Sequence, residues 1–341
     1  MNFTRRKFLI YSGTFVAGSG LFMLGSCEGD KPRLQKFALD YVGPHEFFRD
    51  FRDMCKGIRA AEVSESSFEQ ALSSPSRLSC LAEPLSNRAA KVLMLLEQGK
   101  DVLVLPPLAT NYDEFNAIQL QCNTANRKLA LINPFRYYPS FREFKKKVSD
   151  GSTGRISSIE ISINPGYTIP YLPPLEGMTG PALLLISTLN EILASFPLTV
   201  SAQSSGISGP GENLKLEKLA FEYQDSILNC FFSPGTGSWN IKVSGEKDNL
   251  LLRDNGEMLS DSNGTLIQAD RQIVHDSLRN SLEDFIESVR ESREPESNSV
   301  EGLMQITINR AVWQSIDTGI KTDLVEQSGY NGTDQVQIRK I

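Results

Sequence analysis

Short apolar runs alternate with amphipathic segments through the first 132 residues. The runs that we expect to form strands are residues 36–42, 58–63, 78–82, 101–105 and 128–132. The segments between them space their apolar side chains as helices do, and Thr110 or Asn111 is placed to cap one of these helices. Alternation of this kind is typical of a parallel α/β sheet. The sequence therefore predicts an α/β domain over residues 34–132.

The pattern changes after residue 133. A charged helix (140–148) leads to a strand (159–163) in which apolar and polar residues alternate, so one face of that strand should meet water. The same alternation recurs in Leu219, Phe221 and Tyr223 and in Trp239, Ile241 and Val243. Hairpin turns containing Asn-Gly indicate an antiparallel meander of about five to seven strands, with an apolar face that helices cover only partly.

Helical stripes complete this second part of the chain. We expect helices over residues 180–196 and around 278–289, and a last helix over 300–318 that stops at Gly319. Residues 133–324 are therefore predicted to form an α+β domain with a large, mainly antiparallel sheet. Residues 325–341 have the composition of a loose tail.

The first 27 residues have the pattern of a bacterial export signal. Arg5 and Arg6 match a twin-arginine motif, an apolar segment follows, and the box ending at Cys27 is typical of lipid attachment. Acyl chains on Cys27 would anchor the body to a membrane, with residues 28–33 as a tether. We expect a lipoprotein on the periplasmic side of the membrane or in the cell envelope. A general secretory signal, or an uncleaved anchor, is the alternative.

Charge and cysteine content exclude two classes of site. The net charge of −6 becomes −9 without the three basic residues of the leader, and no basic cluster remains, so nucleic acid is not an expected partner. The other cysteines are Cys55, Cys80, Cys122 and Cys230. None forms a C-x-x-C pair or lies near a histidine, so we expect no metal site and interpret them as buried thiols, with no disulfide assigned.

Residues 99–163 resemble the Gfo/Idh/MocA oxidoreductases, the group of glucose-fructose oxidoreductase and inositol dehydrogenase. The matching motifs are Gly99-Lys100, Pro107-Leu108-Ala109, Arg136-Tyr137-Tyr138-Pro139 and Gly151-Ser152-Thr153-Gly154-Arg155-Ile156. The resemblance extends well over residues 78–324 and poorly over 34–77. It implies a truncated Rossmann-like nucleotide-binding domain, then an α+β domain whose sheet usually forms a dimer interface.

The residues that serve the cofactor in that family are largely replaced. Of the glycine-rich loop only Gly43 remains, because Pro44 and bulky phenylalanines follow it. Pro84 and Pro107 likewise survive as vestigial positions, with Arg88 in place of a family histidine and Leu105-Pro106 in place of Glu-Lys. No acidic residue ends the predicted strand 58–63 where a ribose contact would lie.

The residues that serve the substrate in the family are replaced as well. Leu185 and Leu189 stand where the family has the aspartate and histidine of its substrate helix. Asn190 and Glu191 are the nearest polar side chains, and we interpret them first as the exposed face of an amphipathic helix. With Arg136, they remain candidates for lining a substrate cleft.

These replacements favour a relative that keeps the fold and lacks hydride transfer, with no catalytic residue and no cofactor. Its cleft, lined by Arg136, Tyr137, Tyr167 and Tyr171, would suit a sugar or polyol. Such a protein would bind a glycan or act as a subunit, in a homo-oligomer or with an active paralogue. The alternative is an active NAD(P)-dependent oxidoreductase on a sugar or polyol, with Arg88, Lys100 or Glu191 recruited. An NAD-using glycosidase would need the same cofactor.

Overall fold

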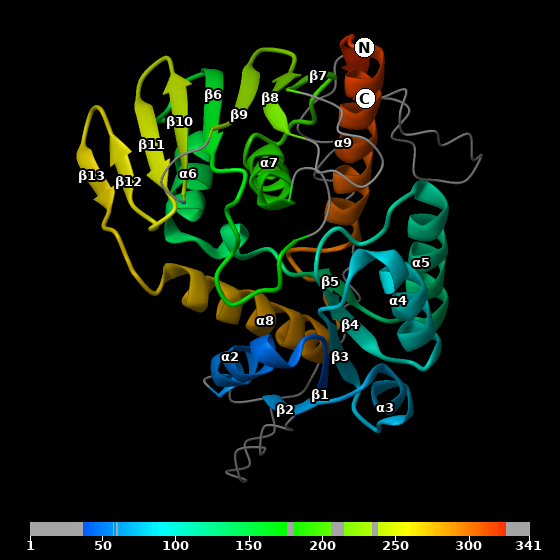
Figure 1. The fold of residues 1–341 in the computed structure, drawn as a ribbon. Helices are drawn as coiled ribbons and strands as arrows, with labels where there is room; N and C mark the ends of the chain where they lie inside the picture. Colours follow the sequence, from blue (N-terminus) through cyan, green and yellow to red (C-terminus); the bar gives the residue numbers. More distant parts are fainter. Residues whose placement is uncertain are drawn as a thin grey trace, which may run out of the picture.

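The computed structural model describes residues 37–56, 58, 61–175, 180–205, 215–233 and 238–324. They form two domains, each built on its own sheet (Figure 1). The long helix α9 (Ser299–Thr318) packs against both, through α5 (Tyr112–Ala125) and β5 (Leu129–Leu131) of the first and β7 (Thr199–Ser204) of the second. None of the helices in the described residues is long and apolar enough to cross a membrane.

The first domain is a five-stranded sheet in the order β2-β1-β3-β4-β5, with every pair parallel. Its strands are β1 (Phe37–Val42), β2 (Ala61–Glu65), β3 (Leu78–Leu81), β4 (Asp101–Val104) and β5 (Leu129–Leu131). The predicted Rossmann-like parallel sheet is confirmed. The strand predicted at 58–63 is wrong in position, because β2 begins at Ala61 and ends at Glu65.

Helices cover both faces of this sheet. They are α2 (His45–Cys55), α3 (Phe68–Ser73), the 3₁₀ turn η1 (Leu85–Asn87), α4 (Arg88–Glu97) and α5 (Tyr112–Ala125). Capping fixes two of their starts. Ser67 and Gln70 form a reciprocal capping box at α3, and the Asn111 side chain accepts the Glu114 backbone N–H at 2.9 Å, as predicted for α5.

The second domain contains a nine-stranded sheet in the order β13-β12-β11-β10-β6-β9-β8-β7-β14. Its strands are β6 (Ile156–Ile163), β7 (Thr199–Ser204), β8 (Leu216–Glu222), β9 (Ile227–Phe232), β10 (Trp239–Gly245), β11 (Asn249–Arg253), β12 (Met258–Ser260), β13 (Gly264–Ile267) and β14 (Thr322–Asp323). All pairs are antiparallel except β6 with β9. The mainly antiparallel sheet is confirmed, with more strands than predicted.

One face of this sheet is covered by α6 (Pro139–Ser149), α7 (Gly180–Ile192) and α9 (Figure 1). The alternating residues Leu219, Phe221, Tyr223, Trp239, Ile241 and Val243 all point to this covered face and are at most 7% exposed. The prediction that they form a partly open face is therefore wrong. Alternation separates the two faces of a strand but does not say which face a helix covers.

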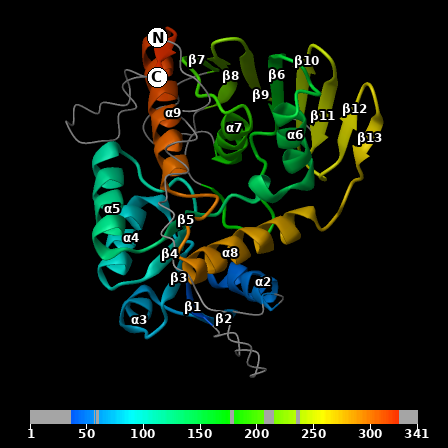
Figure 2. The same cartoon turned by 180° about the vertical axis from the view of Figure 1, so that it is seen from behind.

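A continuous apolar core joins the two domains. Helix α8 (Ile273–Glu291) lies alongside α2 and the short turn η2 (Pro134–Tyr137), between the two sheets (Figure 2). Leu103 of β4 and Ile241 of β10 belong to the same buried cluster. The domains therefore meet across apolar side chains.

Candidate functional site

Gly43 lies where β1 leads into α2, at the carboxyl edge of the parallel sheet, the place at which such folds bind nucleotides. A Cβ atom at Gly43 would lie 2.8 Å from the Ala82 Cβ and 2.9 Å from the Tyr41 hydroxyl oxygen. The glycine is therefore required by contacts within the protein itself. No room for a ligand has to be invoked to explain it.

The loop after Gly43 does not fit a pyrophosphate. Pro44 is the N-terminal cap of α2 and has no N–H to donate, and the Phe47 backbone N–H already donates to the Pro44 carbonyl at 3.1 Å. His45 and Phe48 carry side chains where the fingerprint needs glycines. The Phe48 ring packs on Tyr41, with ring centroids 5.6 Å apart.

Glu65 corrects the expectation that the second strand has no acid at its end. It is the last residue of β2 and pairs in register with Tyr41 of β1, so an acid does end this strand, at the place expected of a ribose contact. The prediction that no acid ends the strand is wrong, because the strand lies further along the chain than its apolar residues suggested. The Glu65 carboxylate lies 2.7 Å from Nδ1 of His45, which is itself at the surface.

Two basic residues considered for recruitment are engaged elsewhere. Arg88 is buried and donates to the carbonyls of Glu83, at 2.6 Å, and Pro107, at 2.8 Å, which joins the loops after β3 and β4. The Lys100 ammonium donates to the carbonyls of Ser74 and Ser76. Burial lowers the pKa of Lys100, and the charge of Asp40 partly offsets this. The vestigial positions Pro84 and Pro107 thus lie in loops held by these internal bonds.

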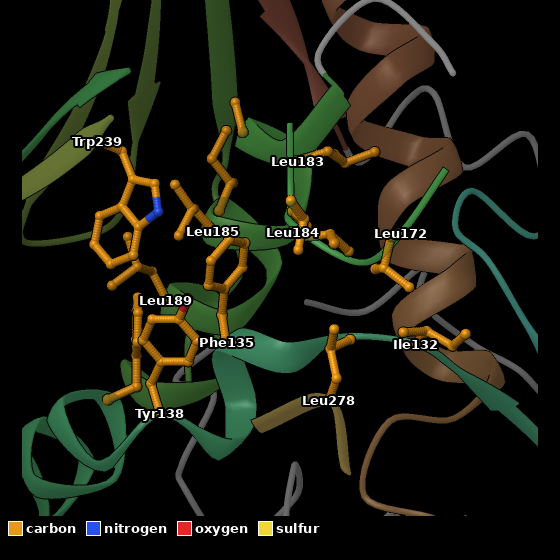
Figure 3. Close-up of a cluster of buried hydrophobic side chains, with 14 of the residues drawn as sticks. Ile132, Phe135, Tyr138, Leu172, Leu183, Leu184, Leu185, Leu189, Trp239 and Leu278 are labelled. Atoms are coloured by element: carbon orange, nitrogen blue, oxygen red, sulfur yellow. The ribbon is translucent and has the colours of Figure 1, made fainter. Parts of the chain in front are cut away.

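Leu185 and Leu189 of α7 occupy the interior of the second domain. Both are fully buried, between Phe135, Tyr138 and Trp239 (Figure 3). The Phe135 and Trp239 rings meet edge to face, with centroids 5.5 Å apart. Where the resemblance places an aspartate and a histidine, the chain therefore has a packed apolar core.

A cavity of about 10 Å³ lies where the two domains meet, roughly the room for one water. The side chains that line it are Phe51, Met54, Leu103, Ile132, Leu172, Leu278, Ser281 and Leu282. Only Ser281 brings a side-chain hydroxyl to this cavity, so the lining contains no acid or base for proton transfer.

Arg136 and Glu191 lie together, as predicted for residues that line one cleft. Both belong to a network of ion pairs within the protein. The Arg136 Nε donates to Glu301 at 2.9 Å, and its Nη1 pairs with Glu191. Lys145 binds the other oxygen of Glu191 at 2.6 Å. Burial acts to lower the pKa of Arg136, but the two carboxylates outweigh it and raise that pKa above its usual value. This guanidinium stays charged and occupied.

Glu301 is the centre of this network and was not identified from the sequence. Its carboxylate also accepts hydrogen bonds from side chains of three different segments. They are the Asn133 amide at 2.6 Å, the Ser187 hydroxyl at 3.0 Å, the Ser297 hydroxyl at 2.6 Å and the Gln305 amide at 3.3 Å. A glutamate in the first turn of a helix suggests an interaction with the helix dipole, and only the fold shows that it joins η2, α7 and α9.

The remaining cleft candidates contact different partners. Tyr137 is buried and donates to Asp284 at 3.0 Å. Asn190 is 1% exposed and hydrogen-bonds Tyr223, so its interpretation as part of an exposed helix face is wrong, because α7 is enclosed on nearly all sides. Tyr167 is buried, whereas Tyr171 is 38% exposed and meets the His275 ring edge to face.

The described part of the chain contains no assembled site for metal binding or for thiol chemistry. No group of three or more His, Cys, Asp or Glu side chains there could hold a metal ion. Cys55, Cys80, Cys122 and Cys230 are buried and unpaired. Burial raises the pKa of Cys55 and of Cys122 to about 12 in each case, which makes both poor nucleophiles. Arg5, Arg6, Cys27 and the tether lie outside the described residues.

Solved structures share this architecture. An oxidoreductase from Agrobacterium radiobacter in complex with NAD+, L-tartaric acid and magnesium has a TM-score of 0.71 at 14% identity, over 85% of this chain and 99% of that one. Aldose-aldose oxidoreductase from Caulobacter crescentus, complexed with glycerol, has a TM-score of 0.71 at 16% identity, over 85% and 100%. The WlbA dehydrogenase from Bordetella pertussis, in complex with NADH and UDP-GlcNAcA, has a TM-score of 0.69 at 15% identity, over 85% and 98%.

No protein-family model and no curated protein matches the sequence. The likeness therefore rests on the structure, and at these identities it concerns the fold. The match with the first of these structures extends over 85% of the chain, so it spans both the parallel sheet and the large mixed sheet. The protein has the two-domain fold of the Gfo/Idh/MocA-type oxidoreductases.

Proposed function

We propose that this protein uses an oxidoreductase fold without hydride transfer and acts in the cell envelope as a sugar-binding or partner subunit. The observation that carries the proposal is the burial of Leu185 and Leu189 beneath Trp239. Hydride transfer to or from a carbinol needs a proton donor or acceptor beside the reacting carbon. Two leucines in a packed core supply neither.

The loop around Gly43 supports the same conclusion for the cofactor, and we expect no useful binding of NAD or NADP. Native mass spectrometry of the purified protein, followed by calorimetry with each dinucleotide, tests this. We expect no retained dinucleotide and no heat of binding at roughly millimolar concentration, a level at which even weak complexes form. A co-purified dinucleotide, or a dissociation constant in the micromolar range, would overturn the proposal.

Glu65 favours the second candidate, an active NAD(P)-dependent enzyme on a sugar or polyol, or a glycosidase that uses NAD. An acid at the end of β2 is the one part of the dinucleotide pattern that the fold restores. If a dinucleotide does bind, Glu65→Gln should weaken it about tenfold or more, since a charge-assisted hydrogen bond to the ribose would be lost. A Glu222→Gln variant, at the surface of the second domain, is the matched control.

For the leader, we propose lipid attachment at Cys27 after export, by the twin-arginine route that Arg5 and Arg6 indicate. Cys27→Ala should leave an uncleaved precursor or release the protein from the membrane. Membrane fractionation with acyl labelling measures both. Unchanged labelling in the variant would show that Cys27 carries no lipid.

For the partner, we propose a homodimer through the open face of the large sheet, with an active relative of the same fold as the other possible occupant. On β8 and β9 this face presents Ile227, 46% exposed, and Phe231, over whose ring the Lys218 ammonium lies at 5.3 Å. Light scattering should give the mass of a dimer, and Phe231→Glu should reduce it to a monomer that stays folded. Stable interfaces bury about 1,600 Å² in total, so the dimer requires an interface of this order.

The interior residue Phe221 is the matched control, because Phe221→Glu should unfold the second domain and leave no folded monomer. A wild-type protein that is monomeric at tens of micromolar would remove the homodimer. A pull-down from native membranes that recovers no relative would remove the heterodimer.

The sugar-binding part of the proposal draws on the ligands of the similar structures. Glycerol, L-tartaric acid and UDP-GlcNAcA, present in those complexes, are all rich in hydroxyl groups. In this chain the polar ends of Arg136 and Tyr137 are already bonded to carboxylates. A sugar is therefore expected at a place other than the contact between the domains.

A further inference from the structure

A tight turn lies between β6 and α7, in residues 169–172. The Leu172 backbone N–H donates to the Ile169 carbonyl at 3.3 Å, which closes the turn around Pro170 and Tyr171. Tyr171 has a φ of 68°, in the left-handed region. Proline followed by a residue of positive φ is the pattern of a type II turn, whose second central position favours glycine. In this chain that position carries a tyrosine.

The left-handed conformation of Tyr171 is strained. A Cβ atom makes a positive φ unfavourable, and bulky residues adopt it rarely. Such strain persists only where surrounding contacts hold it, and it is common at clamps and switches. The contact at Tyr171 is with α8, because its ring meets the His275 ring edge to face, with centroids 5.8 Å apart. The strained position therefore places this ring against α8.

Leu172 is the buried part of the turn. It is 6% exposed and lines the cavity where the two domains meet, together with Met54 of α2 and Leu278 of α8 (Figure 3). Its neighbour Tyr171 reaches the solvent. Leu172 therefore lies between the cavity and the surface, and the turn closes this side of the cavity with an apolar side chain.

Few hydrogen bonds fix the turn in place. Among the residues that the structure describes, the backbone of residues 165–175 forms hydrogen bonds only within this segment and to Asn164. The ring pair of Tyr171 and the burial of Leu172 hold the turn to α8 instead. Local opening is favourable where few such bonds must be broken. The turn is therefore able to lift while the hydrogen bonds of both sheets stay intact.

We infer that residues 169–172 form a latch over the cavity between the domains. The latch opens when the Tyr171 ring leaves His275 and the Leu172 side chain leaves the cavity. Strain at Tyr171 favours the open state, whereas the ring pair and the burial of Leu172 favour the closed state. The latch thus controls access to the apolar side chains between the domains. It needs no dinucleotide, no sugar and no dimer, so it is independent of the proposed function.

Thiol labelling of the full chain measures how often the cavity becomes accessible. Ser281 lines the cavity from α8 and is 4% exposed, so Ser281→Cys places a thiol there. Cys230, fully buried in β9, is the reference thiol in the same molecule. After treatment with iodoacetamide, peptide mass spectrometry gives both rates. We expect the introduced thiol to react about tenfold faster than Cys230 or more, because local opening is more frequent than global unfolding.

Further variants locate the opening at the latch. His275→Ala removes the ring partner and should raise the rate at the introduced thiol about two- to tenfold, the effect of an edge-to-face pair. Arg271→Ala, at an exposed residue just before α8, is the matched control and should leave the rate unchanged. Tyr171→Ala and Tyr171→Gly both remove the ring, but only glycine relieves the strain. The glycine variant should therefore react about fivefold more slowly than the alanine variant.

Two results would overturn the latch. Equal rates at the introduced thiol and at Cys230 would mean that only global unfolding exposes the cavity. A faster rate that His275→Ala leaves unchanged would place the opening elsewhere. Met54 is a second probe in the chain without the introduced cysteine, since it lines the same cavity and hydrogen peroxide converts its thioether to a sulfoxide. His275→Ala should accelerate that oxidation by the same factor, and circular dichroism confirms that each variant is folded.

Discussion

At the carboxyl edge of the first sheet, the side chains at the positions of the cofactor pattern stand at the ends of elements, His45 at the start of α2 and Glu65 at the end of β2. Beneath α7, the replacements are Leu185 and Leu189, inside the core. In the first region the strands, the turns and Gly43 of a nucleotide-binding fold are present, and the side chains around them differ from the pattern of the family that the sequence resembles. In the second region the two differing positions are part of the apolar packing. At the edge, single substitutions could introduce polar groups without disturbing the core. Beneath α7, a polar substitution would lower the stability of the second domain.

The largest expected effect comes from placing an acid in the core beneath α7. Leu185→Asp buries an unpaired carboxylate against Phe135 and Trp239, and we expect it to lower the free energy of unfolding by more than about 4 kcal/mol. Urea unfolding measures this. Leu185→Met, close in volume, should cost less than about 1.5 kcal/mol. Equal costs for the two variants would mean that the helix tolerates a polar site after all.

Glu301 gives the next largest effect. Among the described residues, Glu301→Ala leaves the buried Arg136 with Glu191 as its one remaining carboxylate partner and removes the acceptor of four further side-chain donors. We therefore expect a loss of about 3–5 kcal/mol in the free energy of unfolding. Glu97→Ala, at the exposed end of α4, should change the free energy of unfolding by less than about 0.5 kcal/mol. Similar values for both would show that the network adds little to the contact between the domains.

At the edge of the first sheet, Gly43→Ala should have a moderate effect. The added methyl group would collide with Ala82 and the Tyr41 hydroxyl, and we expect a loss of about 1–3 kcal/mol. Gly166→Ala is the control, since its nearest neighbour would be an ordinary contact at 3.4 Å. Thermal unfolding of both variants compares them. A neutral Gly43→Ala would mean that the loop can move aside and that the edge is less rigid than it appears.

The smallest effect concerns the thiol of Cys55 on α2. Burial raises its pKa from the usual 9.0 to about 12, so the folded state favours the protonated thiol. This contribution to stability is complete below pH 9 and is lost as the pH rises from 9 toward 12. Relative to Cys55→Ala, the wild type should lose about 1 kcal/mol between pH 7 and pH 10, because one pKa unit corresponds to about 1.4 kcal/mol. A constant difference across that range would contradict the raised pKa.

Much of the fold could be predicted because the spacing of apolar residues along the chain determines most helices and strands. This spacing, together with capping residues such as Asn111 at the start of α5, located most of the elements. The errors concern contacts between segments, which the spacing within one segment does not reveal. Which face of β8 and β10 is covered depends on α7 and α9, and the parallel pairing of β6 with β9 joins segments far apart in the sequence. The position of β2 is set by its pairing with β1.

Little of the site could be predicted from sequence. The replacement of an aspartate and a histidine by Leu185 and Leu189 was visible, and their burial gives it a structural meaning. The role of Glu301 was not visible, because it depends on side chains from several segments. An isolated acid in a helix or a turn resembles many surface residues, and only its neighbours in space distinguish it.

Helix α9 has a consequence for how the protein is made. Gly302 lies so close to the loop after β4 that a Cβ would be 3.1 Å from Leu108, and Ser315 accepts the backbone N–H of Ala202 on β7 at 3.0 Å. Both domains are thus completed by a segment that leaves the ribosome after the strands of both sheets, except β14. Until then, apolar surface on α5, β5 and β7 is open to chaperones and to proteases. Domains usually fold in order during translation, but we expect the first domain of this chain to be complete only after α9, which follows the second sheet, has been made.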